Sequence, residues 1–276
     1  MHKIGTFFYS LERAVSEDRA RDIDEAMYKA VNAGICQIDV HSEIANYYDI
    51  NYLCAAMKKN GMTTASIHCA KPINYESDEG YKQSLEDYKQ AAEFAKDMGS
   101  SYFMMVPQMP LDFKKRDFIK FRGKARELIS ELTDYSVSIG LTPTIEDYSV
   151  RTSVCGRLED IKYLLDKNPK LMFTYDSGNF ILSGYDELVG AQLFAERTVY
   201  VHLKDLVYDE ECVEFVSDGI AYDSVALGSG FLRIEKALNI LKNGCFKNGT
   251  VTIESGMTYN SFEKMINSAR YLKEIL

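Results

Sequence analysis

Short apolar runs alternate along the chain with longer segments whose apolar residues recur every three or four positions. This alternation predicts β-strands that are each followed by an amphipathic helix. The predicted strands are Lys3–Ser10, Cys36–His41, Thr63–Cys69, Ser101–Pro107, Leu141–Asp147, Leu171–Asp176, Thr198–Leu206 and Gly249–Ser255. The predicted helices are Glu17–Asn32, Asp49–Lys59, Tyr81–Met98, Phe118–Ile139, Leu158–Lys167, Tyr185–Ala195, Ile234–Lys242 and Phe262–Ile275.

Residues that start or stop helices support several of these boundaries. Ser16 is placed to cap the helix that begins at Glu17, and Asn60-Gly61 stops the second segment of helical period. The segment Val207–Gly230 has no clear period, so the pattern predicts a long loop there.

Eight strands followed by eight helices predict a (β/α)8 TIM barrel, and 276 residues are about what one such barrel requires. No internal boundary is visible, so we expect a single domain over residues 1–276. A doubly wound open sheet is the alternative fold, but the first turn lacks the G-x-G-x-x-G of that fold. Pro143 lies inside a predicted strand and predicts a bulge or a late strand start, because a barrel has no edge strand.

The composition restricts the partners of the protein. Its hydrophobic content of 46% is ordinary for a globular chain, and its net charge of −9 argues against nucleic acid or an anionic membrane as partner. The first residues contain too short an apolar run for a signal peptide, and no segment reaches the roughly 20 apolar residues that span a bilayer. We therefore expect a cytoplasmic protein. The six cysteines lie far apart without a C-x-x-C pair and are expected to be reduced.

Four successive predicted strands end in a chemically active side chain: Glu146, Asp176, His202 and Glu254. The carboxyl ends of barrel strands lie at one rim, so these side chains are expected to meet across the mouth. Three carboxylates in a low-dielectric mouth repel one another unless a cation is present. A single carboxylate is more often a helix cap, and a lone histidine is more often structural, but four consecutive strand ends together favour a divalent-metal site.

Three oxygens and one imidazole nitrogen favour Mn²⁺, with Mg²⁺, Co²⁺ or Zn²⁺ as alternatives. Four protein ligands on an octahedral ion leave two adjacent positions, which two neighbouring oxygens of a hydroxy-ketone could fill. The metal would act as a Lewis acid on the carbonyl and stabilise an enediolate. Glu146 and Glu254, on either side, could then transfer a proton at the carbon between these oxygens.

Several fragments, each weak alone, occur in an order and spacing that resemble the xylose-isomerase-like barrel superfamily of sugar isomerases and epimerases, which includes endonuclease IV and inosose dehydratase. They are N-A-G-I-C-Q-I-D-V at Asn32–Val40, G-M-T-T-A-S-I-H at Gly61–His68, T-I-E-D at Thr144–Asp147, Y-D-S-G-N at Tyr175–Asn179, V-H-L-K-D at Val201–Asp205, L-G-S-G at Leu227–Gly230 and T-I-E-S at Thr252–Ser255. The resemblance covers nearly the whole chain and does not single out one member.

The resemblance implies that Glu146, Asp176, His202 and Glu254 hold the metal, and that the two glutamates form the acid/base pair of a ketose 3-epimerase. Those epimerases usually carry a histidine three residues after the aspartate, where this chain has Asn179. They also often place an arginine after the strand-seven histidine, where this chain has Lys204. H-L-K-D is similar to the inosose-dehydratase branch.

Four further positions are candidates for contact with the substrate. Asn179, at the position just described, is one. His68 could contact substrate hydroxyls or be a structural histidine, and Lys204 could hold a substrate oxygen or pair with Asp205. Phe7 could form an apolar wall for a sugar ring, although packing at the bottom of the barrel and against the helices is the favoured interpretation. Gly228 and Gly230 could shape a phosphate-binding turn, but a plain turn is the simpler interpretation.

The sequence therefore predicts a metal-dependent isomerase or epimerase of a small sugar or polyol ketone. An inosose-type dehydratase with the same metal site is the alternative enzyme, and a barrel that binds sugar or metal without turnover is the alternative of another class. Endonuclease IV activity is disfavoured, because a three-metal cluster needs more histidines than the four present. A small carbohydrate is the expected partner, and a homo-oligomer is possible.

Overall fold

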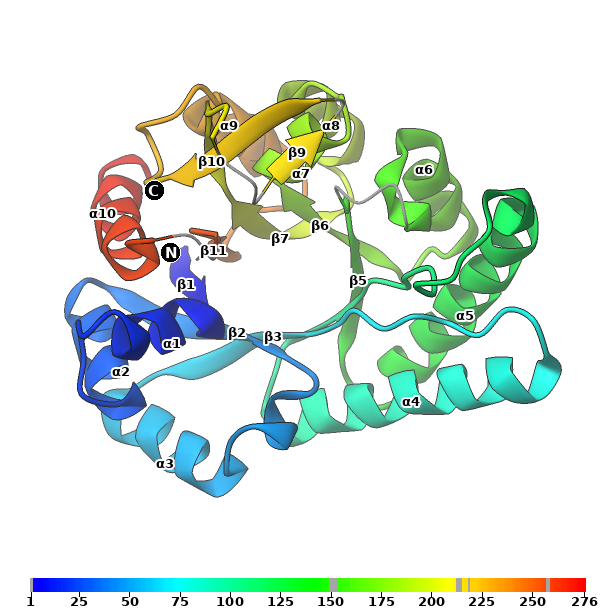
Figure 1. The fold of residues 1–276 in the computed structure, drawn as a ribbon, viewed down its shortest axis with the longest axis horizontal. Helices are drawn as coiled ribbons and strands as arrows, with labels where there is room; N and C mark the ends of the chain where they lie inside the picture. Colours follow the sequence, from blue (N-terminus) through cyan, green and yellow to red (C-terminus); the bar gives the residue numbers. More distant parts are fainter. Residues whose placement is uncertain (1, 149–152, 212–214, 218, 257–258) are drawn as a thin grey trace.

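The computed structural model describes residues 2–148, 153–211, 215–217, 219–256 and 259–276. Eight parallel strands close into a barrel in the order β1-β11-β7-β6-β5-β4-β3-β2, which confirms the predicted fold. Figure 1 looks down this barrel, with the helices arranged around the strands. The barrel strands are β1 (Lys3–Phe7), β2 (Ile35–His41), β3 (Thr63–Cys69), β4 (Tyr102–Met105), β5 (Thr142–Glu146), β6 (Met172–Asp176), β7 (Thr198–Leu203) and β11 (Thr250–Ile253).

The helices pack their apolar faces on the outside of the barrel. They are α1 (Phe8–Ser16), α2 (Ile23–Asn32), α3 (Ile50–Asn60), α4 (Asp78–Asp97), α5 (Phe118–Ser138), α6 (Leu158–Lys167), α7 (Ser177–Leu182), α8 (Glu187–Phe194), α9 (Ile234–Asn243) and α10 (Ser261–Ile275). Short 3₁₀ turns are formed by Ile44–Asn46, Lys115–Asp117 and Val154–Gly156. Among the described residues, none of these helices combines the length and apolar character needed to cross a bilayer.

Local signals in the sequence explain where individual helices begin and end. The side chain of Ser77 accepts a hydrogen bond from the backbone N–H of Gly80 at 3.1 Å and so caps α4. Asp49 caps α3 in the same way, through the N–H of Asn51 at 2.8 Å. Gly61 ends α3 with φ of +71°, a left-handed conformation in which glycine carries no Cβ penalty. The predicted stop at Asn60-Gly61 is therefore where the helix ends.

The first crossover differs from the prediction in two places. The first strand ends at Phe7 and not at Ser10, because Phe8, Leu11 and Ala14 are buried along one face of α1. Ser16 is the last residue of α1, so it does not cap the next helix. That role belongs to Asp22, whose side chain accepts a hydrogen bond from the N–H of Glu25 at 2.8 Å. The prediction treated a strand followed at once by a helix as one continuous apolar run.

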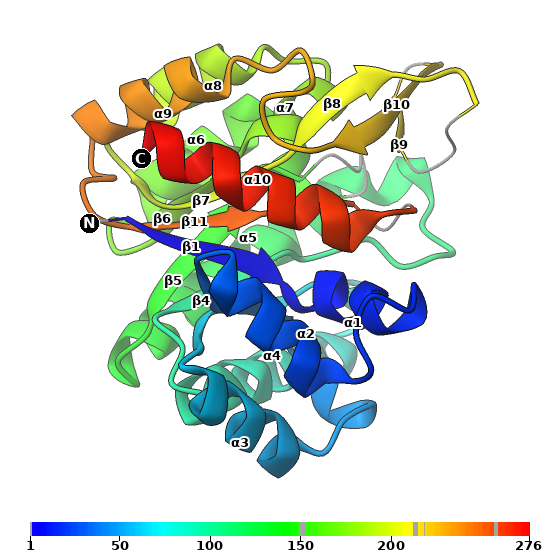
Figure 2. The same cartoon turned by 90° about the vertical axis from the view of Figure 1, so that its left-hand side faces the viewer.

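The segment predicted as a long loop between Val207 and Gly230 is instead largely a small antiparallel sheet. Its strands are β8 (Asp205–Tyr208), β9 (Phe215–Ser217) and β10 (Ile220–Val225), in the order β8-β10-β9. Figure 2 shows this sheet beyond the end of the barrel toward which β1 points. The predicted loop is wrong because these strands pair with one another and not with the barrel.

Pro143 is accommodated without a bulge. It faces Phe103 on β4 with no shift of register along β5, and the pairing of β5 with β6 begins only at Thr144. The strand itself begins at Thr142, one residue later than predicted. The missing backbone donor therefore lies at the start of the strand, before β6 pairs with it.

Candidate functional site

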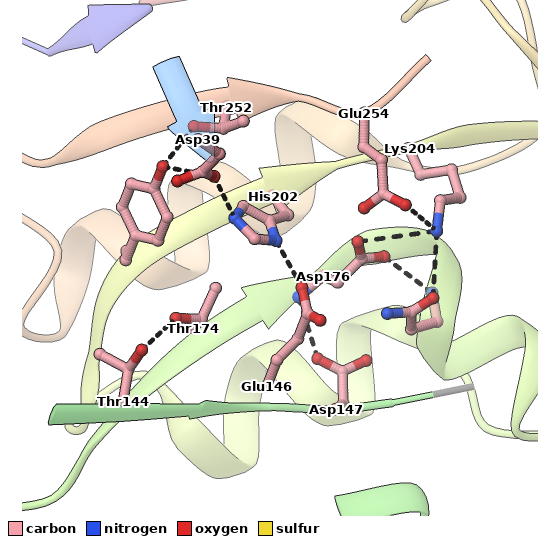
Figure 3. A network of polar contacts seen from close by, with 12 residues as sticks. Asp39, Thr144, Glu146, Asp147, Thr174, Asp176, His202, Lys204, Thr252 and Glu254 are labelled. Atoms are coloured by element: carbon pink, nitrogen blue, oxygen red, sulfur yellow. Dashed lines mark hydrogen bonds and ion pairs between the residues drawn. The ribbon is translucent and has the colours of Figure 1, made fainter. Parts of the chain in front are cut away.

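The four predicted ligand residues meet at the carboxyl end of the barrel (Figure 3). Strand side chains alternate between the interior and the helices, so Glu146, Asp176 and His202 point inward two residues after Thr144, Thr174 and Tyr200. Asp176 and His202 are also direct register partners on β6 and β7. One ligand atom from each of these three residues and from Glu254 lies within 4.8 Å of the others.

The electrostatics of this group favour a cation. Burial, together with repulsion by Glu254 and Glu146, raises the pKa of Asp176 well above its ordinary value. Burial also raises the pKa of Glu146, although His202 opposes this. The Oδ2 atom of Asp176 is buried and finds no hydrogen-bond donor within the described part of the chain. A divalent cation would satisfy this oxygen and neutralise its neighbours, so the residues fit a metal.

His202 is fully buried and contacts a carboxylate on each side of its ring. Its Nδ1 atom lies against Glu146, and its Nε2 atom lies 2.8 Å from the Oδ2 atom of Asp39. Burial alone would lower the pKa of His202, but Glu146 and Asp39 outweigh it and raise the pKa well above the ordinary value. Because Nδ1 contacts Glu146, it is the nitrogen that faces the proposed metal ligands.

Lys204 supplies a positive charge beside the same cluster. It is the third inward-facing residue after Tyr200 and His202, and only 2% of it is exposed. Its Nζ atom lies 2.8 Å from the Oε1 atom of Glu254 and 3.9 Å from the Oδ2 atom of Asp176. Burial by itself raises the pKa of Glu254, but the Lys204 ammonium, together with Asp176 and His202, outweighs it and lowers that pKa to about 2. Lys204 thus contacts the acids directly, and its predicted partner Asp205 binds elsewhere.

Each residue from Asp176 to Asn179 contributes a contact that positions α7 or the side chain of Lys204. Asp176 Oδ1 caps α7 by accepting the backbone N–H groups of Gly178 at 2.7 Å and Asn179 at 2.8 Å. Ser177 Oγ donates to the Lys204 carbonyl at 2.7 Å. A Cβ on Gly178 would lie 2.7 Å from Lys204 Cδ, so glycine leaves room for the lysine stem. Lys204 Nζ donates to Asn179 Oδ1 at 3.1 Å.

Aromatic side chains from β1, β2 and β3 lie next to His202 and to one another. Phe7 packs edge-on against His202 at 4.9 Å between ring centroids and against His68 at 5.5 Å. His68 lies edge-on to His41 at 5.0 Å, and burial lowers the pKa of His68 to about 3. The predicted positions Phe7 and His68 therefore lie at the mouth beside the cluster.

The turn with Gly228 and Gly230 does not offer its backbone to a phosphate. Asp205 Oδ2 accepts their N–H groups at 2.9 and 2.8 Å, and Asp205 Oδ1 accepts those of Leu206 and Leu232 at 3.0 and 3.2 Å. An internal carboxylate therefore holds the position that an anion would take, which matches the simpler prediction of a plain turn.

The residue that the sequence interpretation missed is Asp39, in the middle of β2. Its carboxylate reaches His202 from across the barrel interior (Figure 3). The available signal was the two-residue alternation in Ile35–His41, which places Gln37, Asp39 and His41 on one face of a strand. Buried polar residues on an inward face need partners, and the partner of Asp39 lies 163 positions away.

Comparisons with known proteins identify what the chain is similar to. A family model described as "Xylose isomerase-like TIM barrel" matches residues 28–275. No curated protein matches the chain significantly. Among solved structures, a D-allulose 3-epimerase from Methylomonas sp. in complex with D-allulose superposes with a TM-score of 0.73 at 14% identity, covering 100% of this chain and 97% of that one.

Two further structures are similar to the same extent. The IolI protein with a bound zinc atom has a TM-score of 0.73 at 15% identity, covering 99% of this chain and 97% of that one. A probable 3-DHS dehydratase, AsbF, from Bacillus anthracis has a TM-score of 0.70 at 13% identity, covering 99% of both chains. At such low identity these similarities establish the shared barrel.

Proposed function

Since the chain belongs to the xylose isomerase-like TIM barrel family, we propose that it is a divalent-metal-dependent isomerase or epimerase of a small sugar or polyol ketone. The observation that carries this proposal is the approach of Glu146, Asp176, His202 and Glu254 to within 4.8 Å of one another at the barrel mouth. The sugar epimerase and the zinc-bound protein among the similar structures support the same class.

In this proposal the four side chains hold the cation, with Mn²⁺ favoured by the three oxygens and one nitrogen. When bound, the ion would supply Lewis acidity toward the ketone oxygen of the substrate. Glu146 and Glu254 are the two proton carriers, one on each side of the reacting carbon. Lys204 holds Glu254 in its ionised form, as a base requires, because the ammonium lies 2.8 Å away.

The remaining residues of the mouth orient the substrate. Asn179 and Lys204 present an amide and an ammonium to substrate hydroxyls, while His68 presents a neutral imidazole whose Nδ1 atom is buried and unpaired within the described residues. Phe7 forms an apolar wall against which the carbon face of a sugar can pack. The site thus combines polar contacts on one side with aromatic contacts on the other.

The test is the exchange of a carbon-bound substrate proton with deuterated water in the presence of Mn²⁺. Glu254→Gln is expected to keep the fold and, at Mn²⁺ concentrations high enough to fill the weakened site, to abolish exchange on any ketose that the wild type turns over. Glu43→Gln is the matched control, because Glu43 also pairs with a lysine, Lys71 at 3.2 Å, but lies outside the acid cluster. Absence of exchange by the wild type across a panel of ketoses and inososes would contradict the proposal.

A dehydratase is the second candidate, and Lys204 is the observation that favours it. An ammonium between Glu254 and Asn179 could donate a proton to a departing hydroxyl, which an epimerase does not require. The probable dehydratase among the similar structures supports the same alternative. A conjugated enone product, detected by its ultraviolet absorbance, would distinguish elimination of water from isomerisation.

A further inference from the structure

A chain of buried hydrogen bonds runs through the barrel interior beneath the proposed metal site. Tyr200 Oη donates to Asp39 Oδ2 at 2.7 Å, and the same oxygen lies 2.8 Å from His202 Nε2. Tyr200 Oη also lies 2.5 Å from Thr252 Oγ1. Because the single proton of Tyr200 goes to Asp39, the hydroxyl of Thr252 is the donor in the last contact. The four side chains come from β2, β7 and β11.

We propose that Asp39, held in place by Tyr200, is a positioning residue that keeps the proton of His202 on Nε2. A carboxylate accepts this proton, so the lone pair that binds a metal is left on Nδ1, the nitrogen that faces Glu146. Asp39 acts through the imidazole and touches neither substrate nor metal. This inference rests on the proposed function, because it assigns His202 to the metal.

The surroundings of Asp39 leave the network little freedom. Asp39 is 1% exposed, and the ring of Tyr200 packs against His202 at 5.0 Å and stacks on Tyr102 at 4.8 Å. A Cβ on Gly5 would lie 2.7 Å from Thr252 Oγ1, so glycine is required for Thr252 to approach. Packing therefore fixes the Tyr200 hydroxyl, and the hydroxyl in turn fixes the carboxylate oxygen that His202 contacts.

A purely structural role for Asp39 makes a different prediction. If Asp39 only filled polar space in the barrel, its loss would lower stability and leave the protonation of His202 unchanged. If it positions His202, the site of the proton and the metal affinity must both respond. A neutral residue that still presents an oxygen to Nε2 should then restore most of the effect.

The experiment compares Asp39→Ala, Asp39→Asn and Tyr200→Phe in metal-stripped protein titrated calorimetrically with Mn²⁺. Outer partners of metal-binding histidines typically contribute about 10- to 100-fold in affinity. We expect a loss of that size in Asp39→Ala, a loss below about tenfold in Asp39→Asn, and an intermediate loss in Tyr200→Phe, which keeps the stacked ring and the carboxylate. Gln37→Met is the matched control, since Gln37 is a buried polar residue of the same strand that bonds Thr63 and Thr250.

The second readout is the proton itself, observed by long-range ¹H–¹⁵N correlation on protein labelled at its four histidines. Near neutral pH the metal-free His202 carries a proton on both nitrogens, because Glu146 and Asp39 raise its pKa. The spectra are therefore recorded in metal-free protein at a pH alkaline enough for the ring to have lost one of these protons. Wild type and Gln37→Met are expected to keep the remaining proton on Nε2, and Asp39→Ala to populate both nitrogens. This readout does not need the metal, so it tests the inference even if the wild type fails to bind Mn²⁺ and the proposed function falls. Wild-type His202 protonated only on Nδ1, or Asp39→Ala with unchanged affinity and unchanged proton position, would overturn it. If Asp39→Ala does not fold, the same two readouts on Tyr200→Phe decide.

Discussion

Asp176 is the last residue of β6, and Asp205 lies just after the neighbouring strand β7. Both are buried, at 0% and 1% exposure. Both oxygens of Asp205 are saturated by four backbone N–H groups, from Leu206, Gly228, Gly230 and Leu232. Asp176 is saturated on one oxygen only, where it caps α7, and its Oδ2 atom finds no donor among the residues described.

We propose that the difference separates a carboxylate that holds the fold from one that binds a ligand. Charge-assisted bonds from backbone N–H groups compensate for the burial of Asp205, so it can shape the turn before α9 without a further partner. In Asp176 one buried oxygen accepts no hydrogen bond among the described residues, and it lies beside two other acids with Lys204 at 3.9 Å. A bound cation would offset the cost of this burial. We therefore expect substitutions at the two positions to affect different properties.

The largest effect is expected for Asp176→Asn on metal affinity. The substitution removes one negative ligand, so the affinity for Mn²⁺ should fall by at least about 100-fold, or about 2.7 kcal/mol. The amide oxygen of asparagine can still cap α7, so the metal-free stability should change by less than about 1 kcal/mol. Calorimetric titration and urea unfolding in chelator measure the two quantities. A metal affinity within threefold of the wild type would contradict the assignment of Asp176.

Asp205→Asn should give the reverse result. Its amide nitrogen must face backbone donors, so about 2 kcal/mol of stability should be lost while Mn²⁺ affinity stays within threefold. Asp209→Asn is the matched control, because Asp209 accepts the N–H of Glu211 in an exposed position and its substitution should cost less than about 0.5 kcal/mol. If Asp205→Asn proves as stable as the control, the four hydrogen bonds to Asp205 do not stabilise the turn before α9.

The positions of the strand ends were enough to predict this rim of the barrel from sequence. Glu146, Asp176 and His202 stand at the ends of apolar strands, and parallel strands in a barrel bring such ends together whatever the details of packing. These predictions needed only local pattern and one topological rule.

What the sequence did not predict depends on contacts made across the fold. Asp39 looks like an ordinary polar residue in a strand until β7 is placed opposite it. The strands of the sheet that begins at Asp205 pair only with one another. They therefore lack the pattern of a strand followed by a helix from which the barrel was predicted. Phe8 continues the apolar run of β1, and only the burial of Leu11 one turn later marks the run as the start of a helix.

Metal should stabilise the protein only where the carboxylate of Asp176 is intact. With free Mn²⁺ at ten times the dissociation constant, the free energy of unfolding of the wild type should rise by about 1.4 kcal/mol. Asp205→Asn should gain the same amount, whereas Asp176→Asn should gain almost nothing at that concentration. Thermal unfolding with and without the ion measures this. Equal stabilisation of both variants would mean that the ion binds away from the acid cluster.

His68 is compared with Asp176 because its Nδ1 atom is also buried without a hydrogen-bond partner among the described residues. We expect this atom to bind substrate and not a cation. Burial lowers its pKa from 6.5 to about 3, so the folded protein keeps the imidazole neutral while the unfolded chain takes up a proton below pH 6.5. The stability due to this group is complete above pH 6.5 and is lost as the pH falls. Relative to His68→Gln, the wild type should therefore lose about 0.8 kcal/mol between pH 8 and pH 6. Urea unfolding of both proteins at each pH measures the difference, and a value independent of pH would mean that His68 is as solvated in the fold as in the unfolded chain. A neutral imidazole at the mouth can accept a hydrogen bond from a substrate hydroxyl, which separates the role of His68 from that of Asp176.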